Sequence, residues 1–542
     1  MDRTMSVNAL PVNHGAERIA LRVLQIGAIA AVLAVSTRHV FDLDRFLVPK
    51  EFVLHATALF AAFFGWRAMR QAAVTRIDKL LFVYVLLGAV SALFATNRWL
   101  GLRAFLVSAS AVLIFRVARG LREVGLGRSL LNGLALAIVV TAMTSLLQAY
   151  GLSIDLFALN RAPGGTLGNR NFVAHVMAFG LPLVMLAALR ARRFVLASVG
   201  VALVVAPLVL TRSRAAWLAA AAMLLVYFIA ILASPLVRRD GRTWRRLAMI
   251  VLFAVGGAAA ALVLPNALHW KSDNPYLESM KGVANYEKGS GHGRLVQYGN
   301  SLIMALRHPL LGVGPGNWPV EYPRHVKRGD RSLDPSDPGM TFNPWPSSDW
   351  IAFIAERGIA AAVLLGLALL GIFLAAFRRL ASAPDAEEGL LAATLLAMLA
   401  AAVVAGMFDA VLLLALPSLI VFAGSAAAMP PLSPDATATP SRSRGMAAAV
   451  LSSGGMAAAL LLCAAIGVYR SASQIVAMEL FATSSDRASL ERAARIDPGN
   501  YTVQMHLARH GSRKQRCEHA LAARSLYPLA QAARDVSRPC RE

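Results

Sequence analysis

Long apolar segments recur along the chain and are separated by short, arginine-rich connections. A helix that crosses a bilayer needs roughly 20 mostly apolar residues, and by that rule we expect about thirteen spanning helices. The pattern predicts an all-α, polytopic integral membrane bundle. The expected spans begin near Leu21, Phe52, Lys79, Gly101, Ser129, Asn171, Phe194, Ala215, Leu247, Gly358, Glu388, Ala410 and Met446.

Lysine and arginine are unevenly divided between the two sets of connections that these helices define. One set carries about twenty basic residues and the short members of the other about nine, so the positive-inside rule makes the first set and the N-terminus cytoplasmic. The long connection, residues 266–350, and the C-terminal tail then lie outside. We expect a multi-pass protein of the bacterial inner membrane, with this loop and the tail in the periplasm.

Composition agrees with this class of protein. The 542 residues are 57% hydrophobic and only 15% charged, which excludes an ordinary soluble protein. The net charge of +24 is spread over short connections, unlike the basic stripe of a nucleic-acid-binding protein. Cys463, Cys517 and Cys540 lack the spacing of a metal site, and the last two either pair in an outer tail or stay free.

Four regions follow from the pattern. Residues 1–428 form the bundle, 429–445 a linker rich in Pro, Ser and Thr, 446–468 the last span, and 469–542 a periplasmic helical tail. Within the tail, Ser489 to His510 reads as two short helices around a Pro-Gly turn, which resembles a tetratricopeptide-type hairpin. A single such unit cannot bury its own apolar face, so it must dock on another surface.

The long loop contains an amphipathic helix, Leu295 to Arg307, that runs into a glycine-rich turn with Gly312, Gly314 and Gly316. Glycine permits backbone conformations closed to other residues and a close approach of substrate. A nucleotide-binding interpretation fails because no βαβ unit surrounds the turn.

Several motifs together resemble the O-antigen ligase and polymerase superfamily. An arginine that opens a helix ending in HPLLGVGPGN is similar to the family's loop signature, which implies that Arg294 faces the diphosphate of a lipid-linked donor. LTRSRAAWLA, residues 210–219, resembles the family's Ser-Arg motif and makes Arg214 the second arginine, with Arg212 beside it.

Two further segments carry the same resemblance, which extends over residues 46–360. GGTLGNRNFVAHVMAFGLPL, residues 164–183, is similar to a Gly-x-x-Asn-x-Asn entrance to a span and adds Asn169, Asn171 and the intervening Arg170 as candidate donor-binding residues. VPKEF, residues 48–52, resembles a Pro-Lys segment and adds Lys50. For each basic residue the alternative is a helix-end cation that reaches the membrane surface.

One departure from the family concerns the general base. The family has a His-Asn pair before a Glu-x-Gly, whereas PSSDWIAFIAERGIA, residues 346–360, has Ser347 and Ser348 at those places. A positioned carboxylate or imidazole normally assists the attacking hydroxyl. Asp349 is therefore the first candidate base and His292 the second, although Asp349 is also suited to cap the helix that follows.

The resemblance implies a metal-independent, inverting glycosyltransferase without a cofactor. It would move an oligosaccharide from undecaprenyl diphosphate to an acceptor, with the lipid A core preferred, and its arginines would bind the diphosphate in a bidentate manner. An O-antigen or exopolysaccharide polymerase and a protein O-oligosaccharyltransferase share these motifs. A transporter or a scaffold is a further alternative, but few charges lie at the centres of the expected spans.

Overall fold

The computed structural model describes residues 14–158, 160–270, 272, 274–281, 289–326, 330–432 and 452–540. Within these residues the chain is helical and contains no strand, only two isolated bridges in the long loop. Most of the predicted linker, and the start of the expected last span, lie outside the described residues. The predicted all-α class is confirmed.

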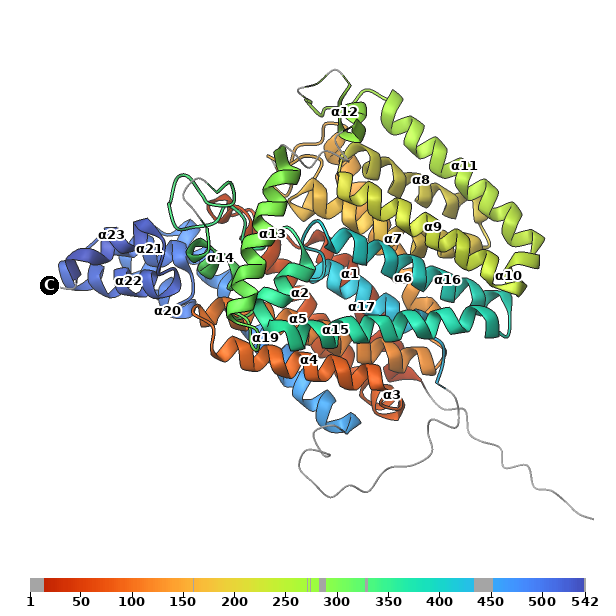
Figure 1. Ribbon diagram of the computed structural model, residues 1–542, viewed down its shortest axis with the longest axis horizontal. Coiled ribbons are helices and arrows are strands. Elements are labelled where there is room, and N and C mark those ends of the chain that lie inside the picture. Colours follow the sequence, from red (N-terminus) through yellow and green to blue (C-terminus); the bar gives the residue numbers. More distant parts are fainter. Residues whose placement is uncertain are drawn as a thin grey trace, which may run out of the picture.

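Each expected apolar segment coincides with one helix of the bundle (Figure 1). In the described part of the chain, nine helices are long and apolar enough to cross a membrane, and α8 and α17 are shorter apolar helices. The remaining two, α1 and α4, pack within the same bundle. The bounds are α1 (Gly15–Leu33), α2 (Asp44–Phe64), α4 (Arg76–Leu93), α5 (Arg98–Glu123), α6 (Gly127–Ala149), α7 (Arg170–Arg190), α8 (Phe194–Leu210), α9 (Arg214–Ala233), α11 (Gly241–Val263), α15 (Asp349–Ser382), α16 (Ala386–Gly406), α17 (Ala415–Ala428) and α19 (Ser453–Thr483).

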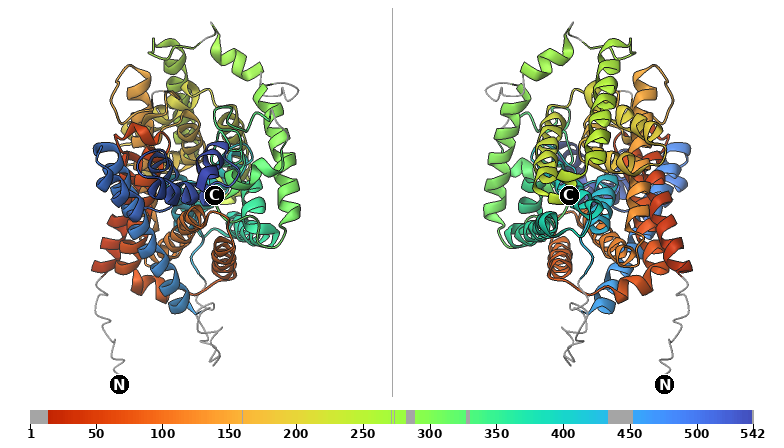
Figure 2. Two further views of the ribbon diagram at one scale, coloured as in Figure 1. Left: turned by 90° about the vertical axis from the view of Figure 1, so that its left-hand side faces the viewer. Right: turned by 90° about the vertical axis from the view of Figure 1, so that its right-hand side faces the viewer.

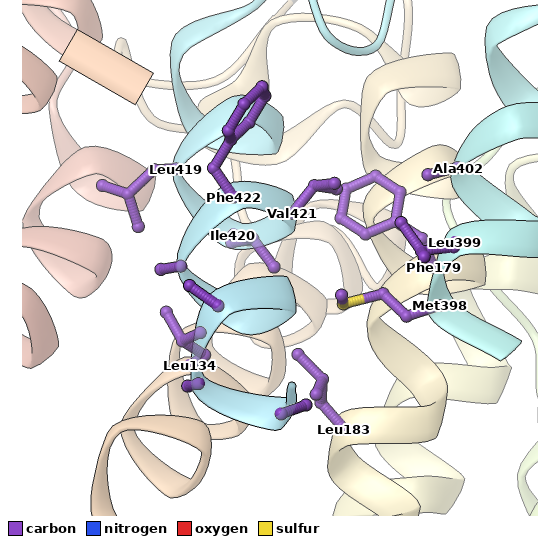
Figure 3. Close-up of a cluster of buried hydrophobic side chains, with 14 of the residues drawn as sticks. Leu134, Phe179, Leu183, Met398, Leu399, Ala402, Leu419, Ile420, Val421 and Phe422 are labelled. Atoms are coloured by element: carbon purple, nitrogen blue, oxygen red, sulfur yellow. The ribbon is translucent and has the colours of Figure 1, made fainter. Parts of the chain in front are cut away.

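The apolar core lies around α7, α16 and α17. Figure 3 shows Phe179 of α7, Met398 of α16 and Phe422 of α17 among the interlocking side chains of this core. By contrast, α11 is peripheral and exposes large apolar side chains such as Leu252 and Val263. An aliphatic exterior of this kind is stable in lipid and not in water.

Buried and half-buried ion pairs stabilise the end of the bundle opposite the long loop. Arg116 of α5 lies 3.0 Å from Asp78, and Arg122 lies 2.5 Å from Glu388 at the start of α16. Each guanidinium therefore pairs with a carboxylate of another helix, and the pair offsets the cost of removing the two charges from water. This end carries the basic connections noted in the sequence.

The long loop and the C-terminal tail lie at the same end of the bundle (Figures 1 and 2). The loop contains α12 (Pro275–Lys281), α13 (Gly289–Arg307), α14 (Trp318–Glu321) and η3 (Tyr322–Arg324). The tail contains α20 (Arg487–Ile496), α21 (Tyr501–Arg509), α22 (Arg513–Leu526), α23 (Gln531–Ser537) and η5 (Arg538–Cys540). Helix α19 continues to Thr483, so it projects from the bundle into the tail.

The tail docks on both the loop and the bundle. The Gln531 amide donates to the carbonyl of Pro338 at 2.8 Å, and the Ala532 amide donates to the Asp337 carboxylate at 3.1 Å. Asn97, the N-cap of α5, donates to the carbonyl of Leu526 at 3.3 Å. A disulfide between Cys517 and Cys540 closes the tail, so the two cysteines pair.

Candidate active site

A cavity of about 640 Å³ opens between the long loop and the bundle. Its wall combines the start of α2, the segment before α7, the first half of α13 and the end of the loop. It brings together Arg294, Asn169, Asn171, Ser347 and Asp409. Three of the residues proposed from sequence, and the position of the missing family histidine, therefore share one cavity.

Asn169 and Asn171 are held by the local geometry at the start of α7. Asn169 is the N-cap residue, and its side chain accepts a hydrogen bond of 3.0 Å from the Asn171 amide. The preceding Gly168 has φ of +80°, and a Cβ atom there would lie under 3.0 Å from the ring of Phe46. Glycine is therefore required for the entrance to this helix.

Asp409 is a carboxylate of the cavity that the sequence argument did not select. It lies between α16 and α17, and the Asn171 amide nitrogen donates to its Oδ2 at 3.3 Å. The Ala410 amide donates to its Oδ1 at 2.9 Å. Because one bond comes from α7 and the other from its own turn, the carboxylate has a fixed position in the cavity wall.

Arg294 is the cation of the cavity that comes from the long loop. Its half-buried side chain makes no hydrogen bond or ion pair with the residues that the structure describes. Two neighbours fix its helix, since the Gln297 side chain accepts from the Ser347 amide at 2.7 Å and the Tyr298 hydroxyl donates to the Ser347 carbonyl at 2.6 Å. The guanidinium is therefore available to bind an anion, and its helix is held in place by the bonds to Ser347.

Arg161 is a second cation of this cavity, and in the sequence it is one basic residue of a short connection. Its exposed side chain also has no hydrogen bond or ion pair to a described residue. The segment before it is held by Arg45, which donates to the carbonyls of Asp155 at 2.7 Å and Phe157 at 3.0 Å. The signal in the sequence was its position shortly before the Asn169 motif.

Arg170 and Arg212 do not line the cavity and instead form a neighbouring group around Trp270. Their guanidinium carbons lie 5.0 and 4.7 Å from the centre of the indole ring. Arg212 has φ of +55° and donates to the Ser279 hydroxyl at 3.0 Å. Arg214, two residues after Arg212, is the first residue of α9. The charge of Arg161 acts on Arg170, so this group adjoins the cavity.

Lys50 lies outside the cavity, in the interior next to it. Its side chain is buried, and Nζ donates to the carbonyl oxygens of Ala34 at 2.6 Å and Thr166 at 2.8 Å. The first bond connects α2 to the end of α1, and the second connects it to the chain before α7. Lys50 therefore has a structural role, since its ammonium group donates hydrogen bonds to two backbone carbonyls.

The two candidate bases also lie away from the cavity lining. Asp349 is fully buried, and its carboxylate accepts from the amides of Val411 at 2.9 Å and Leu412 at 2.8 Å. It therefore holds the connection that carries Asp409. His292 is exposed on α13 and is not part of the lining.

His175 of α7 is a further polar residue near the cavity. It is buried, and neither ring nitrogen has a hydrogen-bond partner among the described residues. The charges of Asp409 and Arg294 both act on it. His175 therefore lies behind the cavity wall, one helical turn after Asn171.

The glycine-rich turn fastens the loop to α15. Gly312, Gly314 and Gly316 have φ values of +65°, +101° and +66°. The buried carboxylate of Glu356 accepts from the amides of Gly316 at 2.8 Å and Trp318 at 3.3 Å. A Cβ atom on Gly312 would lie under 3.0 Å from the Glu356 backbone, so the turn needs glycine for close packing.

In the described ranges, no group of three or more His, Cys, Asp or Glu side chains is placed to hold a metal ion. The cavity offers guanidinium, amide and carboxylate groups instead. This set of groups suits an anionic substrate with hydroxyl groups.

The fold and the cavity define a polytopic helical membrane protein with a polar site under a folded loop. Residues 199–366 match the family model described as O-Antigen ligase, a region that includes Arg212, Arg214, Arg294 and the glycine-rich turn. This match supports membership of the O-antigen ligase superfamily. No curated protein matches it. Membership implies glycosyl transfer of the ligase or polymerase type, with glycan and lipid-linked substrates.

Proposed function

We propose that the protein transfers an oligosaccharide from undecaprenyl diphosphate to a glycan acceptor, with the lipid A core as the preferred acceptor. The observation that carries the proposal is the pair of arginines, Arg294 and Arg161, that line one cavity without a described ion-pair partner. A diphosphate supplies the missing anion, and a guanidinium binds two of its oxygens at once.

In the proposed reaction the acceptor hydroxyl attacks the anomeric carbon of the donor sugar. The new C–O bond forms as the bond to the diphosphate oxygen breaks, and the electron pair leaves with the diphosphate. Arg294 and Arg161 stabilise the charge that develops on that oxygen. Attack opposite to the leaving group inverts the anomeric carbon, and no metal takes part.

Asp409 receives the proton of the acceptor hydroxyl in this proposal. Its carboxylate lines the cavity, whereas that of Asp349 is occupied by two backbone amides and His292 is exposed elsewhere. Asn171 orients the carboxylate and Asp349 positions its turn. The transferred proton then leaves to solvent.

We further propose that the cavity faces the periplasm and that the protein resides in the inner membrane. The disulfide between Cys517 and Cys540 supports an oxidising compartment for the tail, which lies at the same end of the bundle as the long loop that lines the cavity. Donors in that compartment must be lipid-linked, because nucleotide sugars are cytoplasmic.

The test is a transfer assay with the full-length protein in lipid vesicles, an undecaprenyl diphosphate oligosaccharide and lipid A core. Arg294→Ala should reduce the turnover by about 100- to 1,000-fold, the usual effect of losing one donor that stabilises a developing anion. Arg331→Ala changes an exposed arginine of the same loop that does not line the cavity, and should retain wild-type turnover.

A second variant separates proton transfer from donor binding. Asp409→Asn should reduce turnover and leave undecaprenyl diphosphate binding unchanged, because the amide retains the size of the side chain but accepts no proton. Product that grows without lipid A core would favour the polymerase alternative. Equal turnover of Arg294→Ala and wild type contradicts the proposed role of the cavity.

A further inference from the structure

A second cavity of about 410 Å³ lies beside the first one. The two cavities share a partition, which we define as Asp42, Leu43, Phe342, Pro344 and Trp345. Trp345 also packs against Phe172 of α7, with ring centres 5.9 Å apart. A group bound in the second cavity, which we name the tail chamber, is thus separated from the proposed donor site by one layer of side chains.

The C-terminal tail supplies part of the wall of the tail chamber. Thr502 of α21 and Tyr527, at the end of α22, line it together with residues of α2, α5 and α15. The rings of Tyr527 and Tyr501 make an edge-to-face contact, with centres 4.9 Å apart. Burial, with the nearby charge of Asp44, raises the pKa of Tyr527 to about 12, so its hydroxyl stays protonated and can donate a hydrogen bond.

The wall of the tail chamber has an excess of negative charge. Arg103 is already neutralised, since it donates to Glu51 at 2.7 and 2.9 Å and to Asp44 at 2.9 Å. The remaining guanidinium, Arg357, donates to the hydroxyls of Ser108, at 2.8 Å, and Tyr84. Against these two cations stand the carboxylates of Asp42, Asp44 and Glu51, while that of Glu356 is already held by the amides of the glycine-rich turn.

The tail chamber therefore differs from the first cavity in the ligand that it suits. Its partition presents the rings of Phe342 and Trp345, and Tyr527 adds a third aromatic ring. Flat aromatic faces beside carboxylates that accept hydrogen bonds from hydroxyl groups suit a sugar ring, which has apolar faces and a polar edge. A phosphate group would meet like charge in this chamber and would be repelled.

We propose that the tail chamber binds the sugar end of the acceptor, in a form that carries no phosphate, and that the C-terminal tail is part of the acceptor site. This inference rests on the proposed glycosyl transfer. The terminal sugar of the acceptor would extend past the edge of Trp345 into the first cavity, so that its attacking hydroxyl meets the donor there. The docked tail then contributes to acceptor recognition as well as covering the loop.

The first arm of the test fills the tail chamber from the tail side. Thr502→Trp adds a large ring at an exposed position that lines the chamber, whereas Arg509→Trp adds the same ring elsewhere on α21, at an exposed position outside the chamber. In vesicles, Thr502→Trp should raise the KM for the acceptor at least tenfold. Arg509→Trp should leave this KM unchanged.

The second arm measures the donor separately, by native mass spectrometry of each variant with undecaprenyl diphosphate. Both tryptophan variants should bind it as wild type does, and Arg294→Ala should bind it at least tenfold more weakly. A normal acceptor KM in Thr502→Trp overturns the tail chamber as acceptor site but leaves the proposed function intact. Normal donor binding and turnover in Arg294→Ala overturns the proposed function and this inference with it.

The third arm tests the charge of the ligand with two acceptors that differ only in a phosphate on the terminal sugar. Wild type should use the unphosphorylated acceptor at least tenfold better in kcat/KM. Asp44→Asn removes one carboxylate of the wall and should reduce that preference. Equal use of both acceptors by wild type contradicts the charge selection.

Discussion

Replacing Glu356 by alanine should detach the glycine-rich turn from α15. The carboxylate is buried and accepts hydrogen bonds from the amides of Gly316 at 2.8 Å and Trp318 at 3.3 Å. Each amide left without a partner costs roughly 1 to 3 kcal/mol, so the loss should be roughly 2 to 6 kcal/mol. Even the lower value corresponds to a roughly 30-fold larger open population.

Hydrogen exchange of residues 309–321, followed by mass spectrometry in detergent, measures this opening directly. Exchange of these amides should accelerate at least about 30-fold in Glu356→Ala. Glu356→Gln should have a smaller effect, because its amide oxygen still accepts one of the two bonds. Turnover should fall as well, since α13, which carries Arg294, leads directly into this turn.

The matched control is Glu278→Ala in the same loop. The Glu278 side chain is 66% exposed and lies 3.6 Å from Arg212, so its loss should cost less than about 1 kcal/mol. If Glu356→Ala exchanges no faster than Glu278→Ala, the carboxylate does not hold the turn and the reasoning is refuted.

Two further predictions concern the tail and the loop. Serine in place of Cys517 and Cys540, which are 23 residues apart, should lower the free energy of unfolding of the tail, measured by hydrogen exchange, by about 3 kcal/mol. Alkylation of the denatured, unreduced wild type should modify only Cys463. Burial and the charge of Arg307 lower the pKa of His325 from 6.5, so its contribution to loop stability is complete above pH 6.5 and is lost as the pH falls through the lowered pKa. Proteolysis of the loop should therefore accelerate below pH 6.5, and an unchanged acceleration in His325→Gln would contradict this cause.

The start of α7 shows which part of the site could be predicted from the sequence. The Asn169 motif was evident, and its capping bond is local, so its geometry follows from neighbouring residues. Asp409 could not be assigned in the same way, because it is 238 residues from Asn171 and meets it only when α16 and α17 pack beside α7. In the sequence it was simply an aspartate in a short turn.

Lys50 and Asp349 show the opposite case: each is a residue type that suits the proposed chemistry, but in the folded protein its side chain binds backbone groups outside the cavity. A lysine beside a proline and an aspartate at a helix start both fit the proposed chemistry. Their partners are backbone groups of distant segments, the carbonyl of Thr166 for Lys50 and the amide of Leu412 for Asp349. Nothing near either residue in the sequence indicates those partners.

The sequence by itself determined the helical membrane bundle, the glycine-rich turn and the motifs of the superfamily. These features depend on local properties, because a helix in lipid satisfies its own backbone hydrogen bonds and needs only a sufficiently long apolar segment. Tertiary structure decided which side chains line the cavity, that Glu356 holds the turn, and that the tail lines the tail chamber. Those outcomes depend on contacts between segments far apart in the chain, and hydrophobic packing, which is not directional, does not specify them residue by residue.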